Sequence, residues 1–524
     1  MTKPTYIAAL ARPLATRLKE LNFTSDAIRE HLGPELTRAL HRGEPAAVRW
    51  GASGDSDLDI LIRLFLIRDP APKADFERVL GNELAEALLS AAINPDEPLG
   101  DDNHVCGRCV DQEYRVRLDI RPHIINGHDR LIFSDADAAM VAGHVPGPDH
   151  VLGVGAASLS LLRSTPTSEV DSVLDLGTGS GVQALGQWTN AQHITATDIH
   201  PRALALARAT FAAADTPPDL EILSGPWFEP VQHRTFERIL ANPPFVVGLP
   251  EVGHIYRDSG LNLDEASRLV VSQAPKHLRE GGTAHLLAAW IHTDEPWRQR
   301  VASWIPDHGV DAWILQRDIA DPAHYVGTWL RDESLDPRTG ESDVRTQSWL
   351  EHFHNSEVRG IGFGYVALKR LADDEPSRVL AEELPQSFTD ELGPEIEEYF
   401  LRSEWLSTHD PLDATYQLRP GLALEEIFMA NPPSSEFDPE HMGFGETLLR
   451  ITRTEGPRFS HEIDRPLKDI LSAMHPQGLP LRDIVSMYCL SHKADEDAVA
   501  DQVRAAATDL LRHGMIIPAE LLEG

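Results

Sequence analysis

Residues 173–181 have the sequence VLDLGTGSG, a short apolar run that leads straight into a glycine-rich turn. The glycines stand at positions 177, 179 and 181, and a helical pattern follows through Val182 and Leu185. Glycine lets the backbone turn tightly and approach a ligand closely. The spacing differs from the Gly-x-Gly-x-x-Gly of dinucleotide folds, and no Lys-Ser/Thr follows as in a phosphate-binding P-loop. The segment predicts the first strand, turn and helix of an α/β sheet with a ligand at the turn.

The next predicted strand ends in an acid that is suitably placed to bind a ribose. Residues 193–198 have the sequence HITATD. Asp198 lies about 20 residues beyond the first glycine, where an acid bonds a pair of ribose hydroxyls in this kind of βαβ unit. The alternative role is an N-cap for the helix expected over residues 201–214. We count Asp198, with its neighbour Ile199, among the candidate cofactor-binding residues.

A second motif ends a later strand. Residues 238–245 have the sequence RILANPPF. Proline cannot donate to a sheet ladder, so the strand must stop there, and two prolines stiffen the turn. The turn presents an amide and an aromatic ring, which together suit a planar nitrogen. The same Asn-Pro-Pro recurs at 431–433 before a serine, where a proline-rich linker explains it, so the tripeptide alone says little.

Taken in this order, the motifs make residues 130–370 resemble a class I S-adenosylmethionine (SAM) dependent methyltransferase of the HemK and "methyltransferase small" group. The resemblance implies a seven-stranded Rossmann-like sheet and SAM as cofactor. It implies cofactor binding by a glycine loop and an acid: Asp175, Gly177, Thr178, Gly179, Gly181 and Asp198. It implies catalysis by the second motif: Asn242, Pro243, Pro244 and Phe245. Asn242 is counted with the cofactor-binding residues as well.

One position departs from the family pattern. Relatives carry an Asp after the glycine that corresponds to Gly225, and that Asp contacts the adenine of SAM. This chain has Pro226 there, which offers no side-chain acceptor. We therefore expect adenine to rely on backbone groups and on stacking by Trp227 or Phe228, with ordinary core packing as the alternative role of these two rings.

The resemblance also implies a mechanism. The side-chain oxygen of Asn242 and the carbonyl of Pro243 would accept hydrogen bonds from the target NH₂, and Phe245 would stack on the target plane. A loop carrying Tyr256 and Arg257 follows the motif, and both are candidate substrate contacts. No strong general base is required, because the nitrogen becomes acidic only as it gains the methyl group.

The motifs leave the substrate open. A nucleic-acid base amine, adenine or guanine and most of all in ribosomal RNA, is favoured by the phenylalanine at position 245 and by the flanking domains. A protein glutamine is the alternative, favoured by a net charge of −35. A non-enzymatic SAM-binding regulator is the third hypothesis. The acidic charge argues against loose, charge-driven binding of nucleic acid without excluding a local basic cleft.

Composition sets the remaining expectations. The chain has 524 residues, 42% of them hydrophobic, and only three cysteines. No run of about 18 apolar residues occurs, so no membrane span is expected. The first fifteen residues are polar and broken by prolines, unlike a secretory signal. Few cysteines favour a reducing cytoplasm. The oligomeric state stays open.

We expect three domains: a mainly helical one over residues 1–125, the methyltransferase domain over 126–372, and an acidic accessory domain over 373–524. The last is expected to be α-rich, with a winged-helix-like order of two helices and a strand near its end. Cys106 and Cys109 form a Cys-x-x-Cys. A structural zinc site needs four ligands, and we predict no metal, with a site completed by a nearby histidine as the alternative.

Overall fold

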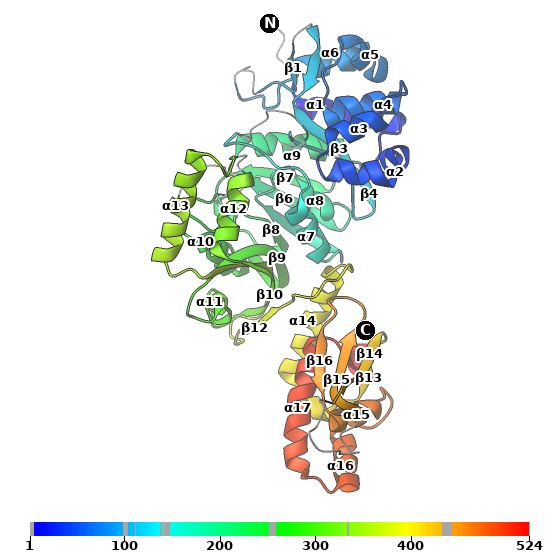
Figure 1. The fold of residues 1–524 in the computed structure, drawn as a ribbon, viewed down its shortest axis with the longest axis vertical. Helices are drawn as coiled ribbons and strands as arrows, with labels where there is room; N and C mark the ends of the chain where they lie inside the picture. Colours follow the sequence, from blue (N-terminus) through cyan, green and yellow to red (C-terminus); the bar gives the residue numbers. More distant parts are fainter. Residues whose placement is uncertain are drawn as a thin grey trace. The chain divides into compact units, whose positions relative to one another are not determined.

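The computed structural model describes residues 5–97, 103–109, 112–136, 140, 147–250, 258–332, 335–431 and 443–522. The chain divides into two compact units, residues 1–162 with 167–383, and residues 163–166 with 384–524. Figure 1 shows the elements of each unit. Within the described ranges, no helix combines the length and the apolar character that a membrane crossing needs.

The first unit begins with a helical part. Its helices are α1 (Ile7–Glu20), α2 (Ser25–His41), α3 (Pro45–Gly51), α4 (Asp57–Leu61), the π-helical η1 (Ile62–Ile67), α5 (Lys73–Leu80) and α6 (Asn82–Ser90). On α1, Leu10, Leu14 and Leu18 recur at every fourth position and are buried, which is the periodicity of an amphipathic helix. This core also takes in Ala203 and Leu206 of a helix that belongs to the main sheet. The helical part is therefore packed on the sheet domain.

Short strands connect the helical part to the sheet. They are β1 (Cys106–Arg108), β2 (Tyr114–Val116), β3 (Leu118–Ile125) and β4 (His128–Asp135), followed by α7 (Ala156–Ser164). β3 and β4 form an antiparallel hairpin. Its inward side chains Ile125 and Ile132 join the core on one face of the main sheet. The hairpin thus leads the chain to that sheet.

The main sheet has eight strands in the order β12-β10-β11-β9-β8-β5-β6-β7. Its strands are β5 (Val170–Leu176), β6 (Ala191–Asp198), β7 (Asp219–Ser224), β8 (Phe236–Ala241), β9 (Leu278–His292), β10 (Val310–Ala320), β11 (Gly360–Arg370) and β12 (Arg378–Glu383). Only β11 runs antiparallel to its neighbours in this sheet. The class I sheet that the motifs predict is present as β5 to β11.

The predicted count of seven strands is one too low. β12 adds to the outer edge of β10 in parallel. Two side-chain contacts hold it there: Arg378 Nε lies 3.1 Å from Asp311 Oδ2, and Trp313 Nε1 donates to Glu382 Oε1 at 2.7 Å. β12 lies beyond residue 372, where the methyltransferase domain was expected to end. The three-domain division remains a prediction.

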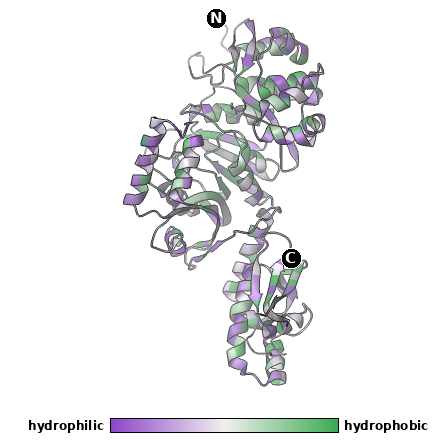
Figure 2. Cartoon of the chain, viewed as in Figure 1, coloured by the Kyte–Doolittle hydropathy of each residue, from purple (hydrophilic) through white to green (hydrophobic). Residues whose placement is uncertain are grey.

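Helices cover both faces of this sheet (Figure 1). They are α8 (Val182–Gly186), α9 (Pro201–Ala213), η5 (Glu229–Val231), α10 (Glu265–Gln273), η6 (Ala274–His277), α11 (Trp297–Ala302), α12 (Pro322–Asp332) and α13 (Gly340–Asn355). Figure 2, which colours the ribbon by residue hydropathy, shows hydrophobic residues along the sheet strands and a more hydrophilic α13. α12 and α13 form the connection between β10 and β11.

The topology brings the predicted site residues to one edge. β5 lies between β6 and β8, and all three run parallel. Their carboxyl ends therefore meet, and ligands bind at such an edge in open α/β sheets. The glycine turn follows β5, Asp198 ends β6, and Asn242 follows β8.

The second unit has its own sheets and helices. They are α14 (Gly393–Thr408), η7 (Pro411–Asp413), β13 (Tyr416–Leu418), β14 (Leu422–Ala430), β15 (Phe444–Arg453), β16 (Ser460–Ile463), α15 (Arg465–Ser472), α16 (Leu481–His492), α17 (Glu496–Arg512), β17 (Ile516–Pro518) and η9 (Ala519–Leu522). The expected order of helix, longer helix and strand is present as α16, α17 and β17. β14, β15 and β16 form a three-stranded antiparallel sheet.

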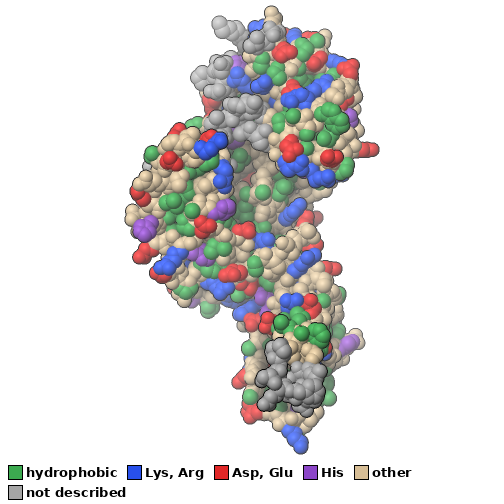
Figure 3. Space-filling view, in the orientation of Figure 1, with side chains coloured by type: hydrophobic (Ala, Val, Ile, Leu, Met, Phe, Trp, Pro, Cys, Tyr) green, Lys and Arg blue, Asp and Glu red, His purple; other side chains and the backbone are tan. Residues whose placement is uncertain are grey.

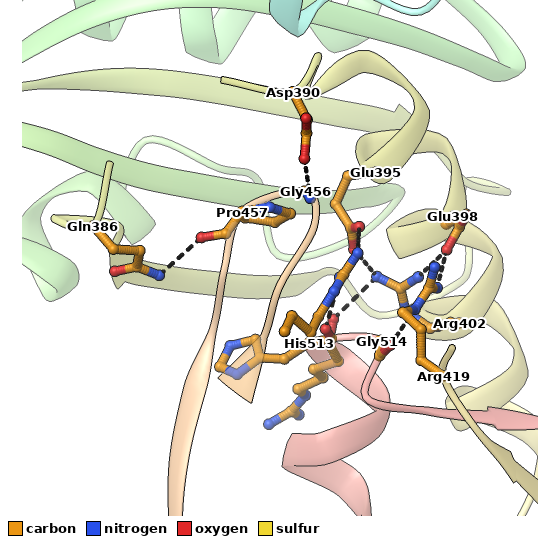
Figure 4. A network of polar contacts seen from close by, with 12 residues as sticks. Gln386, Asp390, Glu395, Glu398, Arg402, Arg419, Gly456, Pro457, His513 and Gly514 are labelled. Carbon is orange, nitrogen blue, oxygen red and sulfur yellow. Dashed lines mark hydrogen bonds and ion pairs between the residues drawn. The ribbon is translucent and has the colours of Figure 1, made fainter. Parts of the chain in front are cut away.

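A buried ion network joins distant segments of the second unit. Glu395 on α14 is 5% exposed. Its oxygens lie 2.5 Å from Arg402 Nη2 and 2.7 Å from Arg453 Nη2 at the end of β15. Figure 4 shows Glu395 facing Arg402, with Glu398 bridging Arg402 and Arg419. Charges buried in this way require partners, and here the partners come from α14, the end of β15 and the turn between β13 and β14.

Candidate functional site

A cavity of about 780 Å³ opens at the carboxyl edge of β5, β6 and β8. It brings together most of the predicted cofactor-binding and catalytic residues. Those on its wall are Gly177, Thr178, Gly179, Asp198, Ile199, Trp227, Asn242, Pro243, Pro244 and Phe245. The volume is in the range of small-molecule and cofactor sites.

The glycine turn owes its shape to a buried acid behind it. Asp175 is 1% exposed, and its Oδ2 accepts hydrogen bonds from Thr178 Oγ1 at 2.6 Å and Ala184 N at 3.0 Å. Burial raises the pKa of Asp175 to about 6. Gly181 has φ +88, and a Cβ there would lie 2.6 Å from the ring of Phe211. Asp175 and Gly181 thus shape the loop from behind the cavity wall.

Asp198 is held by two backbone amides. Its Oδ2 accepts from Gly179 N at 3.0 Å, and its Oδ1 accepts from His200 N at 2.9 Å. Burial raises the pKa of Asp198 above its ordinary value. A carboxylate oxygen accepts more than one hydrogen bond, so both oxygens keep capacity for hydroxyl donors in the cavity. The N-cap of α9 is His200, whose side chain accepts from Arg202 N at 3.3 Å. The alternative role considered for Asp198 is thus filled by another residue.

The two rings after Pro226 have different environments. Trp227 lies on the cavity wall, with a left-handed backbone at φ +47. Phe228 is 3% exposed and stacks on His277, with ring centroids 4.6 Å apart and planes at 5°. Phe228 is a core residue, and Trp227 alone of the two is placed to stack on a ligand.

The Asn242 turn rests on a cluster of aromatic side chains. Phe245 meets Phe363 of β11 edge to face, with centroids 6.5 Å apart. Just beyond the turn, Val247 N donates to the hydroxyl of Tyr325 on α12 at 2.7 Å. Tyr325 is 2% exposed and stacks on Phe363 at 5.7 Å. The strand end is thus anchored to the helical connection between β10 and β11.

Several wall residues were not predicted from the sequence. Trp329 on α12 lines the cavity and meets Tyr325 edge to face at 6.1 Å. It lies far along the chain from every motif, so no local signal indicated it. Gln183 also lines the cavity. A polar residue just past the glycine turn, on the helix face that becomes buried, was the available signal.

Two predicted substrate contacts, Tyr256 and Arg257, lie outside the described residues. The described residues that follow them, Asp258 and Ser259, line the cavity.

Among the described residues no group of three or more His, Cys, Asp or Glu is arranged to hold a metal ion. Burial raises the pKa of Cys106 to about 12.

Three family models match this chain. Residues 152–292 match the methyltransferase small domain, residues 20–98 match a domain of unknown function (DUF7059), and residues 397–518 match another (DUF7782). The first match covers the cavity's glycine turn, acid and Asn242 motif. It confirms the resemblance to the methyltransferase small group for that segment.

Curated relatives share the same region. A release factor glutamine methyltransferase of Cereibacter sphaeroides is 37% identical over 134 residues, which is 23% of this chain and 48% of that protein. A ribosomal RNA small subunit methyltransferase C of Haemophilus influenzae is 33% identical over 134 residues, 24% of this chain and 36% of that protein. The chain thus spans about half or less of the length of these relatives.

Among solved structures, the chain is similar to a T. thermophilus 16S rRNA N2 G1207 methyltransferase in complex with AdoMet and guanosine. The identity is 22%, the match covers 42% of this chain and 55% of that one, and the TM-score is 0.25. That TM-score is too low to support the fold assignment, which rests on the strand order of the main sheet.

Proposed function

We propose that this chain, which carries a methyltransferase small domain over residues 152–292, is a SAM-dependent N-methyltransferase acting on a macromolecule. The observation that carries the proposal is that Asp198 and Asn242 lie on the wall of one cavity. One provides a carboxylate for a ribose, and the other an amide for a target nitrogen. A cytoplasmic location is part of the same proposal.

The wall residues fit SAM at its nucleoside half. Asp198 would bond the ribose hydroxyls, held in place by the amides of Gly179 and His200. Ile199 and Trp227 would cover the adenine. These contacts would hold the ring in place of the side-chain acceptor that is missing at Pro226. SAM supplies an electrophilic methyl group on a sulfonium.

The Asn242 turn would position the target. The side-chain oxygen of Asn242 and the carbonyl of Pro243 accept hydrogen bonds from an NH₂ group, which directs its lone pair toward the methyl carbon. When bound, SAM would supply its methyl group to this nitrogen and leave as S-adenosylhomocysteine, and the methylated nitrogen would release its extra proton to solvent. Positioning of this kind supplies up to about 7–11 kcal/mol in well-oriented cases. The rigid prolines and the Tyr325 anchor support that role.

Aromatic side chains favour a nucleobase as the target plane. Phe245 and Trp329 line the same cavity and are linked through Phe363 and Tyr325. Stacking of a base on an aromatic ring contributes about 1–3 kcal/mol. We therefore place an adenine or guanine amine first, with ribosomal RNA favoured.

A protein glutamine is the second candidate. The net charge of −35 favours it, because an acidic surface repels phosphate at long range. Figure 3 shows Asp and Glu interspersed with Lys and Arg on the face drawn. A relative named as a release factor glutamine methyltransferase points the same way.

A label-transfer assay tests the proposal. Purified protein and tritiated SAM are incubated with ribosomal RNA, DNA and protein extract from a strain lacking the gene. We expect label in RNA, on an exocyclic amine after nucleoside digestion. Label on glutamine selects the second candidate. Binding of S-adenosylhomocysteine without transfer to any fraction contradicts an enzymatic role and favours a SAM-binding regulator.

A further inference from the structure

The three-stranded sheet of the second unit has two unlike edges. Its order among the described strands is β14-β15-β16, so β14 and β16 are the edge strands. β16 has four residues, three of them polar. β14 has nine residues and contains neither lysine nor proline. Natural edge strands are often short or carry lysine or proline, because their open backbone groups invite another strand to pair. β14 lacks these protections.

Large apolar side chains are exposed along β14. Leu424 is 46% exposed, Phe428 49% and Met429 60%. Phe444, on the paired strand β15, is 72% exposed. Side chains alternate between the two faces of a strand, so Leu424 and Phe428 lie on one face. Ala430 lies opposite Phe444, which makes Phe428 and Phe444 diagonal neighbours on that face, within reach of aromatic side chains. Leu424, Phe428 and Phe444 thus form one apolar surface, the β14 surface.

The β14 surface continues the face of the sheet that carries core residues. Leu424 lies opposite Ile451 on β15. Ile451 is 4% exposed, as is Leu449. Lys468 of α15 pairs with Glu426 of β14, which brings that helix to the same sheet. The face is therefore buried over β15 and exposed along β14. Apolar side chains grouped in this way on a surface mark protein-interaction sites, whereas single ones need no explanation.

The charge of the second unit indicates the kind of partner. Residues 384–524 carry 26 Asp and Glu against 11 Lys and Arg. The two cations beside β14 are engaged by glutamates of that strand, Arg450 by Glu425 at 2.8 Å and Lys468 by Glu426. An excess of acid repels the phosphates of a nucleic acid and a second copy of the same unit, and it attracts a basic partner. The β14 surface therefore fits an extended segment in which apolar residues alternate with Lys or Arg.

We propose that β14 is a docking edge for a basic protein segment, which pairs with it as an added strand. In this mode of recognition, backbone hydrogen bonds to the open edge provide affinity and alternate side chains provide specificity. The partner's apolar side chains pack on the β14 surface, and its cations face the acidic unit. This inference is independent of methyl transfer. It assigns a partner to the part of the chain, residues 397–518, that matches a domain of unknown function.

Peptide binding to the intact chain tests the proposal. The probe is a fluorescent peptide as long as β14 that alternates Lys and Val, and fluorescence anisotropy measures its affinity. We expect binding that protects β14 from hydrogen exchange and that weakens as salt is added. Replacing each Lys of the peptide by Glu removes the charge attraction, and methylating its backbone nitrogens removes the donors that pair with the edge. Each change is expected to abolish binding.

Two double variants separate the β14 surface from net charge. Leu424→Lys with Phe428→Lys is expected to bind the peptide about 10–100-fold more weakly, because apolar contacts are lost and like charge is added. Met487→Lys with Leu490→Lys is the matched control, since it adds the same charge at side chains 60% and 81% exposed on α16 of the same unit. We expect the control to bind more tightly than the β14 variant by that factor. Thermal denaturation shows that both variants are folded. Equal weakening in both overturns the inference.

Other results contradict the basic segment as the occupant of β14. They include absence of peptide binding by the wild-type protein, and equal binding of the Glu peptide. Self-association of the chain that is lost in Leu424→Lys with Phe428→Lys assigns the edge to a second copy. Binding of a single-stranded RNA oligonucleotide that is lost in Phe428→Ala assigns the surface to nucleic acid. Each of these outcomes overturns the inference and leaves the proposed methyl transfer, which has its own label-transfer assay, unaffected.

Discussion

Asp198 in the first unit and Glu395 in the second are both acids withdrawn from bulk water, and they differ in what surrounds them. Asp198 has two backbone amides for partners, and burial raises its pKa. Burial acts the same way on Glu395, but Arg402 and Arg453 outweigh it and hold the pKa of Glu395 below its ordinary value. Glu395 is satisfied by the protein's own cations, whereas Asp198 keeps capacity for a ligand. A raised pKa in a cavity thus marks the candidate site.

Removing the charge of Glu395 is expected to have the largest effect on stability. Glu395→Gln removes the buried anion that Arg402 and Arg453 share and leaves Arg402 with Glu398 alone, and breaking a buried pair in this way costs about 3–5 kcal/mol. We expect the second unit to unfold at much lower denaturant, while the affinity of the first unit for S-adenosylhomocysteine is unchanged. Glu391→Gln, an exposed acid just before the same helix, is the control. Equal stability of the two variants contradicts a structural role for Glu395.

The pH dependence of stability differs in sign between the two regions. The pKa of Asp175 is about 6 in the folded state against 3.8 ordinarily, so between these values the folded state binds the extra proton. The free energy of unfolding of the first unit therefore falls, by up to about 3 kcal/mol, as pH rises through that window. The lowered pKa of Glu395 acts oppositely: its contribution is present at neutral pH and is lost as pH falls through acid values.

Denaturation of the ligand-free protein between pH 4 and pH 7 measures this difference. Asp175→Asn is expected to remove the first unit's fall in free energy of unfolding with rising pH. Asp219→Asn, on an exposed acid of β7, is expected to leave it. If the free energy of unfolding of Asp175→Asn depends on pH as in the wild-type protein, another group is responsible.

Asp198→Ala tests whether this acid contributes to ligand binding more than to stability. Losing hydrogen bonds to a charged acceptor costs about 1.5–3 kcal/mol, so we expect the dissociation constant for S-adenosylhomocysteine to rise about 10–100-fold. The loss of stability should be smaller than in Glu395→Gln, because no buried cation is left unpaired. Calorimetric titration and denaturation of both variants give the two numbers. A large loss of stability with unchanged affinity would make Asp198 a structural acid like Glu395.

Trp329→Ala is expected to have the smallest effect and to act on the target alone. Loss of one stacking ring lowers kcat/KM for the identified substrate about tenfold. The affinity for S-adenosylhomocysteine stays the same, because Trp329 lies with the Asn242 turn. Trp50→Ala, which removes an indole 74% exposed in the helical part, is the comparison variant. An equal loss in both variants argues against a specific role for Trp329.

Local sequence patterns were sufficient for the centre of the site and insufficient for its surroundings. The glycine turn, Asp198 and Asn242 each follow a strand whose apolar run ends at a recognisable residue, so their shared edge was predictable from a parallel sheet. Trp329 and the eighth strand depend on contacts between distant segments, Tyr325 with Val247 and Arg378 with Asp311. The N-cap of α9 at His200 depends on atomic geometry that a residue pattern does not carry.

The most direct test of the central claim is methyl transfer by Asn242→Ala, measured beside its affinity for S-adenosylhomocysteine. Removing one preorganised hydrogen-bonding group from a site of this kind lowers turnover about 10²–10³-fold. We predict this loss of methyl transfer for Asn242→Ala. Its affinity for S-adenosylhomocysteine should stay close to that of the wild-type protein, because Asp198 and the glycine turn are intact. Transfer at the wild-type rate would contradict the assignment of Asn242 as the residue that orients the target nitrogen.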